Sequence, residues 1–387
     1  MGDRTKLRTA VAISATVALG AIAISSCSGG PSLSTTLHVD PSRLASDEPV
    51  ELTLPTTMCR GLFVADVLIN GTGPYPMIVD TGASRTTVTP RVKREAGIGS
   101  RMDSLRMGDF DVSGVRVKSR ELQHIADALG TPVEGIVGHD VFRGVLATYD
   151  YRESAIRVSN AQLTSDMPHT VPTKRNSSRP FVRTSIDYDG DAESDGSFWL
   201  LIDTGAVRSV AIVPFDDLTY KADPVAIGAV TKINGLHLVR GARLDGDLSF
   251  GPVKMSEPII ETSPWTNLVG HELLRDYVIS FDQRADLARF VPISGEPFTE
   301  EPLRGFGIAL QGVGERIRIA KVFEDSSAER AGLLKDDLLI AVNGTPINKG
   351  RCDPDRSLTG DLPIATLTIE REGERMDVDV EVMVLVQ

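Results

Sequence analysis

Two stretches of the chain decide the fold: PMIVDTGASRTTVTP at residues 76–90 and WLLIDTGAVRSVAIVP at residues 199–214. Each is an apolar run that ends in Asp-Thr-Gly-Ala, with an arginine shortly after the aspartate. Further along, GIVGHDVFRGVLATYDYR at residues 135–152 and NLVGHELLRDYVISFDQR at residues 267–284 align without a gap. Two matched pairs in the same order indicate an internal repeat. We therefore predict two copies of one β-rich unit, unit 1 at residues 49–160 and unit 2 at residues 179–298.

Length and composition limit the remaining possibilities. A chain of 387 residues exceeds one ordinary core, since domains hold about 100–200 residues. Hydrophobic residues make up 41% and charged residues 24%, which excludes a disordered chain and an integral membrane protein. The net charge of −12 offers no field for phosphate backbones, so we expect no nucleic-acid partner. The 35 glycines, 22 prolines and short apolar runs favour β structure.

The paired motifs resemble those of the pepsin and retropepsin aspartic proteases. In that family each lobe supplies one Asp-Thr-Gly loop, and a segment like Ile-Val-Gly crosses beneath it. The resemblance implies that Asp80 and Asp203 are the catalytic pair. Two adjacent carboxyls share one proton, so one can activate water while the other donates to the peptide carbonyl. The supporting residues are Thr81 and Thr204, which brace the loops, and Gly82 and Gly205, which allow close approach.

Both motifs continue with alanine, at Ala83 and Ala206. Many acid-active relatives carry serine or threonine at one of these places, and that hydroxyl stabilises the carboxylate. Without it, the lower apparent pKa of the pair should be less depressed. We therefore expect activity at mildly acidic to neutral pH.

The interval between the two motifs is longer in unit 2, which contains VTKINGLHLVRGARL at residues 230–244. Asn-Gly between alternating segments predicts a hairpin. In aspartic proteases a hairpin here forms the flap over the substrate, so we predict one working flap, on unit 2, with its tip at Asn234, Gly235 and Leu236. The alternative is a hairpin that is merely a sheet edge. In unit 1 a short helix is expected at residues 121–129, ended by Gly130.

After Pro297 the pattern changes: residues 304–310 read RGFGIAL, and residues 316–347 read RIRIAKVFEDSSAERAGLLKDDLLIAVNGTPI. With these motifs, residues 299–387 resemble a PDZ domain of the bacterial envelope type. Ser326 and Glu329 form a capping-box pattern before a short helix. The resemblance implies that the loop of Gly305, Phe306, Gly307 and Ile308 holds a peptide carboxylate and that the peptide adds as a strand. Residues 350–361 are short and contain proline and glycine where the family has a helix. Peptide capture and a purely structural role therefore remain open.

The first 27 residues have the layout of an export signal, with a basic stub and an uncharged apolar run. They end in Ile-Ser-Ser-Cys, which resembles the lipobox of bacterial lipoproteins and implies lipidation of Cys27. The alternatives are an uncleaved anchor or a plain signal peptide. Residues 28–48 are rich in Ser, Gly, Pro and Asp and predict a flexible tether.

The other candidate residues have simpler interpretations. Cys59 and Cys352 could pair in an oxidising compartment, but they lie in different predicted domains, so free buried thiols are favoured. His139 and His271 occupy equivalent places in the repeat and are expected to form structural hydrogen bonds. The acidic stretch 187–195 is expected to be a solvated loop. No motif calls for a metal or another cofactor.

Together these observations predict a mainly β protein with two pseudo-symmetric acid-protease-type lobes and a small PDZ-like β-barrel domain with short helices. The boundaries are 1–27 signal peptide, 28–48 tether, 49–160 lobe 1, 161–178 linker, 179–298 lobe 2 and 299–387 PDZ-like domain. The expected function is aspartic endopeptidase of the bacterial envelope, lipid-anchored, at the periplasmic face of the outer membrane. Its expected partners are peptides or unfolded proteins and the membrane, and the chain is expected to be monomeric. The alternative is a non-catalytic peptide-binding scaffold lipoprotein.

Overall fold

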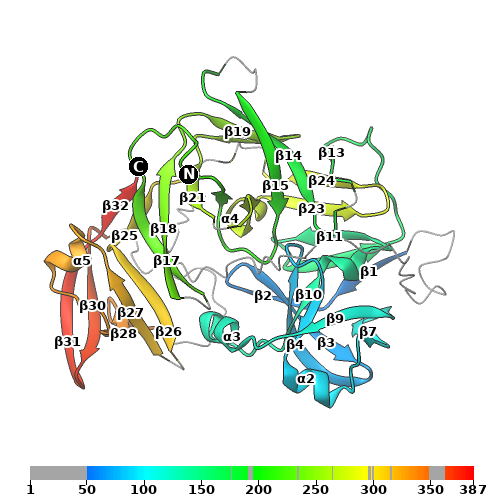
Figure 1. Cartoon of the computed structure of the whole chain (residues 1–387), viewed down its shortest axis with the longest axis horizontal. Coiled ribbons are helices and arrows are strands. Elements are labelled where there is room, and N and C mark those ends of the chain that lie inside the picture. Colours follow the sequence, from blue (N-terminus) through cyan, green and yellow to red (C-terminus); the bar gives the residue numbers. More distant parts are fainter. Residues whose placement is uncertain are drawn as a thin grey trace, which may run out of the picture.

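The computed structural model of the chain describes residues 50–175, 177–190, 195–232, 235–263, 265–294, 298, 300–313, 316–347 and 362–387. These residues form a mainly β protein, as predicted, with five sheets and a few short helices (Figure 1). Among them, no helix has the length and apolar character needed to cross a bilayer. The predicted signal peptide, Cys27 and the tether lie outside the described residues.

Unit 1 is built on a nine-stranded sheet. Its order is β6 (Arg101–Met102), β9 (Val115–Ser119), β5 (Thr86–Val88), β10 (Gly135–Gly138), β4 (Thr72–Asp80), β3 (Leu62–Ile69), β7 (Leu105–Met107) and β8 (Phe110–Val112), and β2 (Thr56–Cys59) pairs with β3. Helix α2 (Pro90–Glu95) follows β5, and α3 (Gln123–Leu129) lies between β9 and β10. The short helix η1 (His139–Phe142) follows β10.

Unit 2 repeats this order in a second nine-stranded sheet. The strands are β17 (Val225–Lys232), β18 (Gly235–Arg243), β21 (Ile259–Thr262), β16 (Val210–Ile212), β22 (Leu268–Val269), β15 (Gly196–Ile202), β14 (Phe181–Asp187), β19 (Asp247–Phe250) and β20 (Val253–Ser256). Helix α4 (His271–Leu274) follows β22 as η1 follows β10. The two-residue β6 of unit 1 corresponds to the nine-residue β18, and β17 is an additional strand.

A six-stranded sheet joins the two units. Its order is β1 (Glu51–Leu54), β12 (Ala155–Ser159), β11 (Leu146–Asp150), β23 (Tyr277–Asp282), β24 (Leu287–Pro292) and β13 (Thr170–Pro172). At its centre Thr148 of unit 1 faces Ser280 of unit 2, and their hydroxyls are 2.9 Å apart. The rings of Tyr149 and Phe281 meet at 5.7 Å in a core that both units share. The units are therefore one packed body.

The C-terminal part forms a separate small core. A six-stranded sheet contains β26 (Ile308–Val313), β27 (Arg316–Val322), β28 (Leu338–Val342), β30 (Ile364–Arg371) and β31 (Glu374–Glu381) in this order, with β29 (Thr345–Pro346) paired to β28. A two-stranded sheet pairs β25 (Leu303–Gly305) with β32 (Met383–Val386). Strand β26 is an edge strand, and residues 348–361, where the second groove wall of a PDZ domain is expected, lie outside the described residues.

Several local predictions are confirmed. Helix α3 ends at Gly130, whose φ of 71° is left-handed and suits glycine. Ser326 caps α5 (Ser327–Arg330) by accepting a hydrogen bond from Glu329 N at 3.1 Å. The return bond of the predicted capping box is shifted, because the Glu329 carboxylate accepts from Asp325 N at 2.8 Å instead of from Ser326 N.

The predicted hairpin is also present, but two of the three residues predicted for its tip lie in a strand. Strands β17 and β18 pair in antiparallel register, and the last pair joins Lys232 to Gly235. Gly235 and Leu236 therefore belong to β18, and Gly235 is not a turn residue. Asn234 lies outside the described residues together with residue 233.

The expectation of free thiols is wrong for Cys59, which is disulfide-bonded. Its partner lies outside the described residues, as do both other cysteines, Cys27 and Cys352. Cys59 ends β2 and is fully buried in a cluster with Leu62, Ile78 and residues of α3. Tertiary packing can bring cysteines that are far apart in the sequence within bonding distance, so sequence separation does not exclude a disulfide.

Candidate active site

The two aspartates come from equivalent points of the two sheets. Strand β4 ends at Asp80, and β15 ends one residue before Asp203. In unit 1 the crossing strand β10 runs parallel to β4, and Gly138 pairs with Asp80. In unit 2 the short strand β22 runs parallel to β15, and Val269 pairs with Ile202. The last apolar residues of the two strands, 77–79 and 200–202, are buried, so each Asp-Thr-Gly loop begins in the core.

The two loops are tied together by the predicted threonines. Thr81 N donates to Thr204 Oγ1 at 3.0 Å, and Thr204 N donates to Thr81 Oγ1 at 3.0 Å. Each hydroxyl then donates across the interface, Thr81 to Ile202 O at 2.7 Å and Thr204 to Val79 O at 3.1 Å. Both threonines are fully buried. Four hydrogen bonds without solvent competition fix the relative position of the loops.

The predicted glycines lie where the opposite carboxyl leaves no room. A Cβ on Gly82 would lie 2.4 Å from the carboxyl carbon of Asp203, and a Cβ on Gly205 would lie 2.4 Å from that of Asp80. The backbone N–H groups of the same glycines orient their own aspartates. Gly82 N donates to Asp80 Oδ1 at 2.7 Å, and Gly205 N donates to Asp203 Oδ1 at 2.9 Å. The structure therefore brings together all six residues predicted for the two loops.

The two carboxyls titrate as a pair. Burial raises the pKa of each above the usual value of aspartate. The negative charge of Asp80 and the hydrogen bond between the two side chains raise the pKa of Asp203 further. The same hydrogen bond and those from Gly82 and Ala83 favour the charged form of Asp80. The two carboxyls therefore share one proton, and the pKa of Asp203 is raised more strongly than that of Asp80.

Arg179 is a site residue that sequence reasoning missed. Its backbone precedes Pro180, whose carbonyl accepts a hydrogen bond from Ile202 N at 2.9 Å beside the Asp203 loop. Its positive charge lowers the pKa of both Asp80 and Asp203, while burial lowers the pKa of Arg179 itself. The pairing of Phe181 with Leu201 makes Arg179 the counterpart of Leu62 in unit 1. The two strands show no common motif at this position, so only the register could have revealed it.

The repeat-equivalent histidines pack against aromatic rings. His139 meets the ring of Phe281 edge-on at 5.5 Å, and His271 lies 5.1 Å from the ring of Tyr151. Burial lowers the pKa of each to about 3, so both are neutral. Their Nδ1 atoms have no hydrogen-bond partner among the described residues, contrary to the expected structural hydrogen bonds. In the structure the two imidazole rings therefore pack in the core through contacts with aromatic rings.

The hairpin and the C-terminal domain touch each other. Strand β17 contacts the edge strand β26, which lies beside it in Figure 1. Ala226 and Ala229 of β17 pack on Ala309 and Phe323, and on its other side Ile227 packs in a cluster with Leu303 and Val386. Helix α3 of unit 1 also contacts β26. The predicted flap is therefore supported from its base by the C-terminal domain.

In the loop predicted to bind a carboxylate, the carbonyl groups accept hydrogen bonds from the rest of the domain. Phe306 O accepts from Ala328 N at 3.0 Å, and Gly307 O accepts from Phe323 N at 2.9 Å. Gly307 has φ +75°, and a Cβ there would lie 2.2 Å from Cβ of Ser326, so no other residue fits. The N–H groups of Phe306 and Gly307 donate no hydrogen bond within the described part of the chain. Such donors suit a carboxylate.

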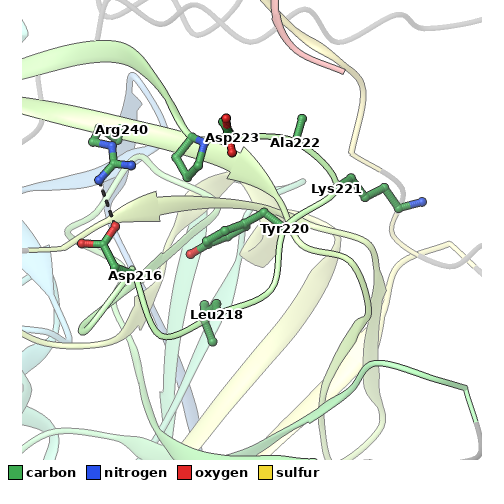
Figure 2. Close-up of a pocket in the computed structure, with 8 residues that line it drawn as sticks. Asp216, Leu218, Tyr220, Lys221, Ala222, Asp223 and Arg240 are labelled. Atoms are coloured by element: carbon green, nitrogen blue, oxygen red, sulfur yellow. Dashed lines mark hydrogen bonds and ion pairs between the residues drawn. The ribbon is translucent and has the colours of Figure 1, made fainter.

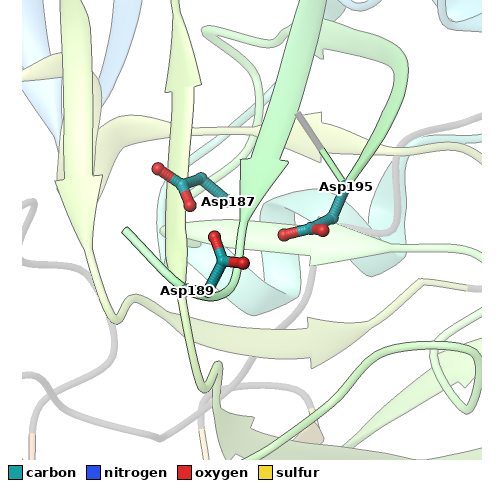
Figure 3. A group of neighbouring side chains, drawn as sticks. All are labelled: Asp187, Asp189 and Asp195. Atoms are coloured by element: carbon teal, nitrogen blue, oxygen red, sulfur yellow. The ribbon is translucent and has the colours of Figure 1, made fainter. Parts of the chain in front are cut away.

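Two further polar features lie apart from the predicted site. A cavity of about 400 Å³ in unit 2 is bordered by Tyr220, Lys221 and the ion pair of Asp216 with Arg240, 2.9 Å apart (Figure 2). Figure 3 shows the carboxylates of Asp187, Asp189 and Asp195, whose oxygens lie within 4.8 Å of one another.

The acidic group of Figure 3 is part of the connection between β14 and β15. Asp187 accepts a hydrogen bond from Gly190 N at 2.8 Å, and Asp195 accepts one from Tyr188 N at 2.6 Å. Asp189 and Asp195 are exposed, as expected for a solvated loop. Asx side chains commonly stabilise turns in this way, so the cluster has a structural explanation.

Comparison with known families agrees with the geometry. Residues 65–123 match the family described as aspartyl protease, and residues 298–353 match the PDZ domain. No curated protein gives a significant match to the chain. The chain therefore contains an aspartyl protease domain, whose match includes Asp80, and a C-terminal PDZ domain.

Proposed function

We propose that the protein is an aspartic endopeptidase that hydrolyses peptide bonds with water activated by Asp80 and Asp203. The observation that carries the proposal is a pair of carboxyls, Asp203 buried and Asp80 half-buried, that share a hydrogen bond inside a frame braced by two threonines. Two like charges in contact cannot both persist in a buried site, so the pair holds one proton at working pH. A purely structural role gives no reason to retain two such acids.

The asymmetry of the pair assigns the roles. Asp80 is partly exposed and charged, so it takes a proton from the attacking water. Asp203 is protonated and donates to the carbonyl oxygen of the scissile bond as the tetrahedral intermediate forms. The hairpin of β17 and β18 closes over the bound peptide and excludes water.

The PDZ domain supplies peptide engagement or regulation. A peptide that pairs with the edge strand β26 approaches β17, because the two strands contact each other. Binding at this edge therefore moves the hairpin, which places peptide capture and flap position under common control. This contact favours a regulatory role over a purely structural one.

The location of the protein is proposed from its N-terminal sequence. Cleavage before Cys27 and acylation of that cysteine would anchor the chain to the bacterial envelope, at the periplasmic face of the outer membrane. Both aspartates lie on one chain, so the site is complete in a monomer. The substrates proposed are peptides or unfolded segments of envelope proteins.

The test is cleavage of a peptide library by the chain starting at Ser28, across about pH 3–8, a range that spans the carboxylate reference values and neutrality. Asp80→Asn and a pepstatin-type inhibitor run in parallel. Cleavage that is lost in the variant and blocked by the inhibitor supports the dyad. A folded chain that binds peptides and cleaves none at any pH would instead support the alternative, a non-catalytic peptide-binding scaffold lipoprotein.

A further inference from the structure

Two aromatic side chains of unit 2, Phe181 and Trp199, are surrounded by three basic groups. Lys174 Nζ lies 5.8 Å from the centre of the Phe181 ring and 5.5 Å from that of Trp199. The guanidinium carbon of Arg179 lies 5.0 Å from the Phe181 ring, and that of Arg183 lies 5.7 Å from the Trp199 ring. We call these five residues the basic platform. Cation–π attraction holds the flexible basic chains in defined places.

The basic platform ends at the catalytic pair. Arg183 faces Trp199 across β14 and β15, and Phe181 faces Leu201 further along the same strands. Phe181 also packs with Ala206, which belongs to the Asp203 loop. Continuing the register by two residues brings Arg179 level with Asp203. A peptide bound at the catalytic pair can therefore reach the platform along unit 2.

The positive charges of the basic platform are balanced only in part, by the single negative charge of the aspartate pair near Arg179. None of its three basic groups forms an ion pair within the part of the chain that the structure describes, and Arg183 donates to the neutral hydroxyl of Ser197. The chain has 53 acidic and 41 basic residues, so unpaired cations are not enforced by its composition. Arg179 is half-buried, where an unpaired charge costs more than at the surface.

The fold itself does not require a cation at this place. The counterpart of Arg179 in unit 1 is Leu62, which is fully buried in a cluster with α3. In unit 2 a short connection, residues 263–267, replaces that helix between β21 and β22. The same sheet position therefore accepts an apolar residue. The stability of the fold does not explain why unit 2 has a cation there.

We infer that the basic platform binds acidic side chains of the substrate, so that the enzyme selects acidic peptides. Guanidinium groups bind carboxylates in a bidentate and strongly charge-assisted way. The active pair carries one negative charge, which repels an acidic peptide, and the platform offsets that repulsion. The inference rests on the proposed proteolytic function, because it places the substrate at Asp80 and Asp203.

Binding of twin peptides tests the inference without cleavage. The probes are fluorescein-labelled peptides of a library in which each glutamate-containing peptide has a glutamine twin. Anisotropy is measured with the Asp203→Asn chain, which retains the platform. We expect glutamate twins to bind about 10-fold more tightly, the size of one charge-assisted contact. The advantage should disappear with Arg179→Gln added, persist in part with Arg179→Lys, and be unchanged with Lys254→Gln, a matched charge removal elsewhere on unit 2.

The outcomes separate this inference from the catalytic proposal. Equal binding of the twins to the chain with an intact platform would overturn the inference and leave catalysis untouched. If the glutamate peptides bind more tightly but the unaltered protein cleaves no peptide, the basic platform is supported and only the protease proposal is overturned. If circular dichroism shows that Arg179→Gln unfolds the chain, the double variant Lys174→Gln and Arg183→Gln replaces it. Its glutamate advantage should then fall, and an unchanged advantage would contradict the platform.

Discussion

Units 1 and 2 share a strand order but differ in what covers their sheets. In unit 1, α3 covers the face that contains Leu62 and Ile78, and the strand corresponding to β18 has only two residues. In unit 2 that face bears Phe181 with charged neighbours, and the long hairpin rests on the C-terminal domain. The two units therefore share one arrangement of strands, whereas the side chains and elements around the two aspartates differ. Each unit supplies one aspartate, and the charged neighbours of Phe181 belong to the surroundings of unit 2 alone.

The largest expected effect tests whether the two aspartates work as one pair. Asp80→Asn and Asp203→Asn should each lower kcat by about 10³-fold or more, since each removes one partner of the acid–base exchange. The measurement is initial cleavage rate on a library substrate, with thermal unfolding as control for folding. If either variant alone kept most of its activity, the pair would not be the catalytic unit.

A second prediction concerns the hairpin, which has no long counterpart in unit 1. Ile227 is 1% exposed and lies in a cluster with Leu303 and Val386 of the C-terminal part. Ile227→Ala should destabilise the chain by about 2–5 kcal/mol through a buried cavity. Chemical denaturation measures it, and hydrogen exchange in β32 should rise with that in β17. Unchanged exchange in β32 would show that the hairpin does not depend on the C-terminal domain.

Substitutions of Gly82 and Gly205 test whether the two Asp-Thr-Gly loops are packed equivalently. Gly82→Ala and Gly205→Ala each place a Cβ 2.4 Å from the opposite carboxyl carbon. Each should cost about 1–3 kcal/mol of stability from overpacking and should also lower activity. Gly99→Ala, at an ordinary backbone conformation with open space around it, serves as a control. A large difference between Gly82→Ala and Gly205→Ala would mean that the loops are not equivalent in packing.

Arg179 tests the electrostatic difference between the units, because Leu62 has no charge to offer. The arginine lowers the pKa of both aspartates, so Arg179→Met should raise both values. The acidic limb of the rate profile needs Asp80 ionised, and the alkaline limb needs Asp203 protonated. Both limbs should therefore move to higher pH in kcat/KM profiles. A profile that does not move would show that the guanidinium does not affect the pair.

The smallest effect concerns the alanines after the motifs. Ala83 N already donates to Asp80 Oδ1 at 3.1 Å, so a hydroxyl on residue 83 would lie near the same carboxylate. Ala83→Ser should lower the pKa of Asp80 and extend activity to lower pH, moving only the acidic limb. Ala206→Ser is the paired control in unit 2. An optimum of the unaltered protein below about pH 3, under the reference carboxylate values, would contradict the expected mildly acidic to neutral range.

Much of the candidate site could be predicted because the repeated motifs consist of consecutive residues. Asp80, Thr81 and Gly82, with their partners Asp203, Thr204 and Gly205, each lie in one short motif after an apolar strand. The hairpin of β17 and β18 was also predicted, because alternation and turn residues are local signals. Arg179 was missed because its position beside Asp203 depends on the pairing of Phe181 with Leu201. A shift of the strand register by one residue would change that position.

The sequence by itself determined the mainly β class, the repeated Asp-Thr-Gly loops and the short helices with their caps, since these follow from neighbouring residues. Only the tertiary structure decided that the pKa values of the two aspartates are raised to different extents, because a pKa depends on burial and on charges brought from distant segments. It also decided that Cys59 forms a disulfide and that β17 meets β26. Such contacts join residues far apart in the chain, and their free energy comes from packing that no local pattern encodes.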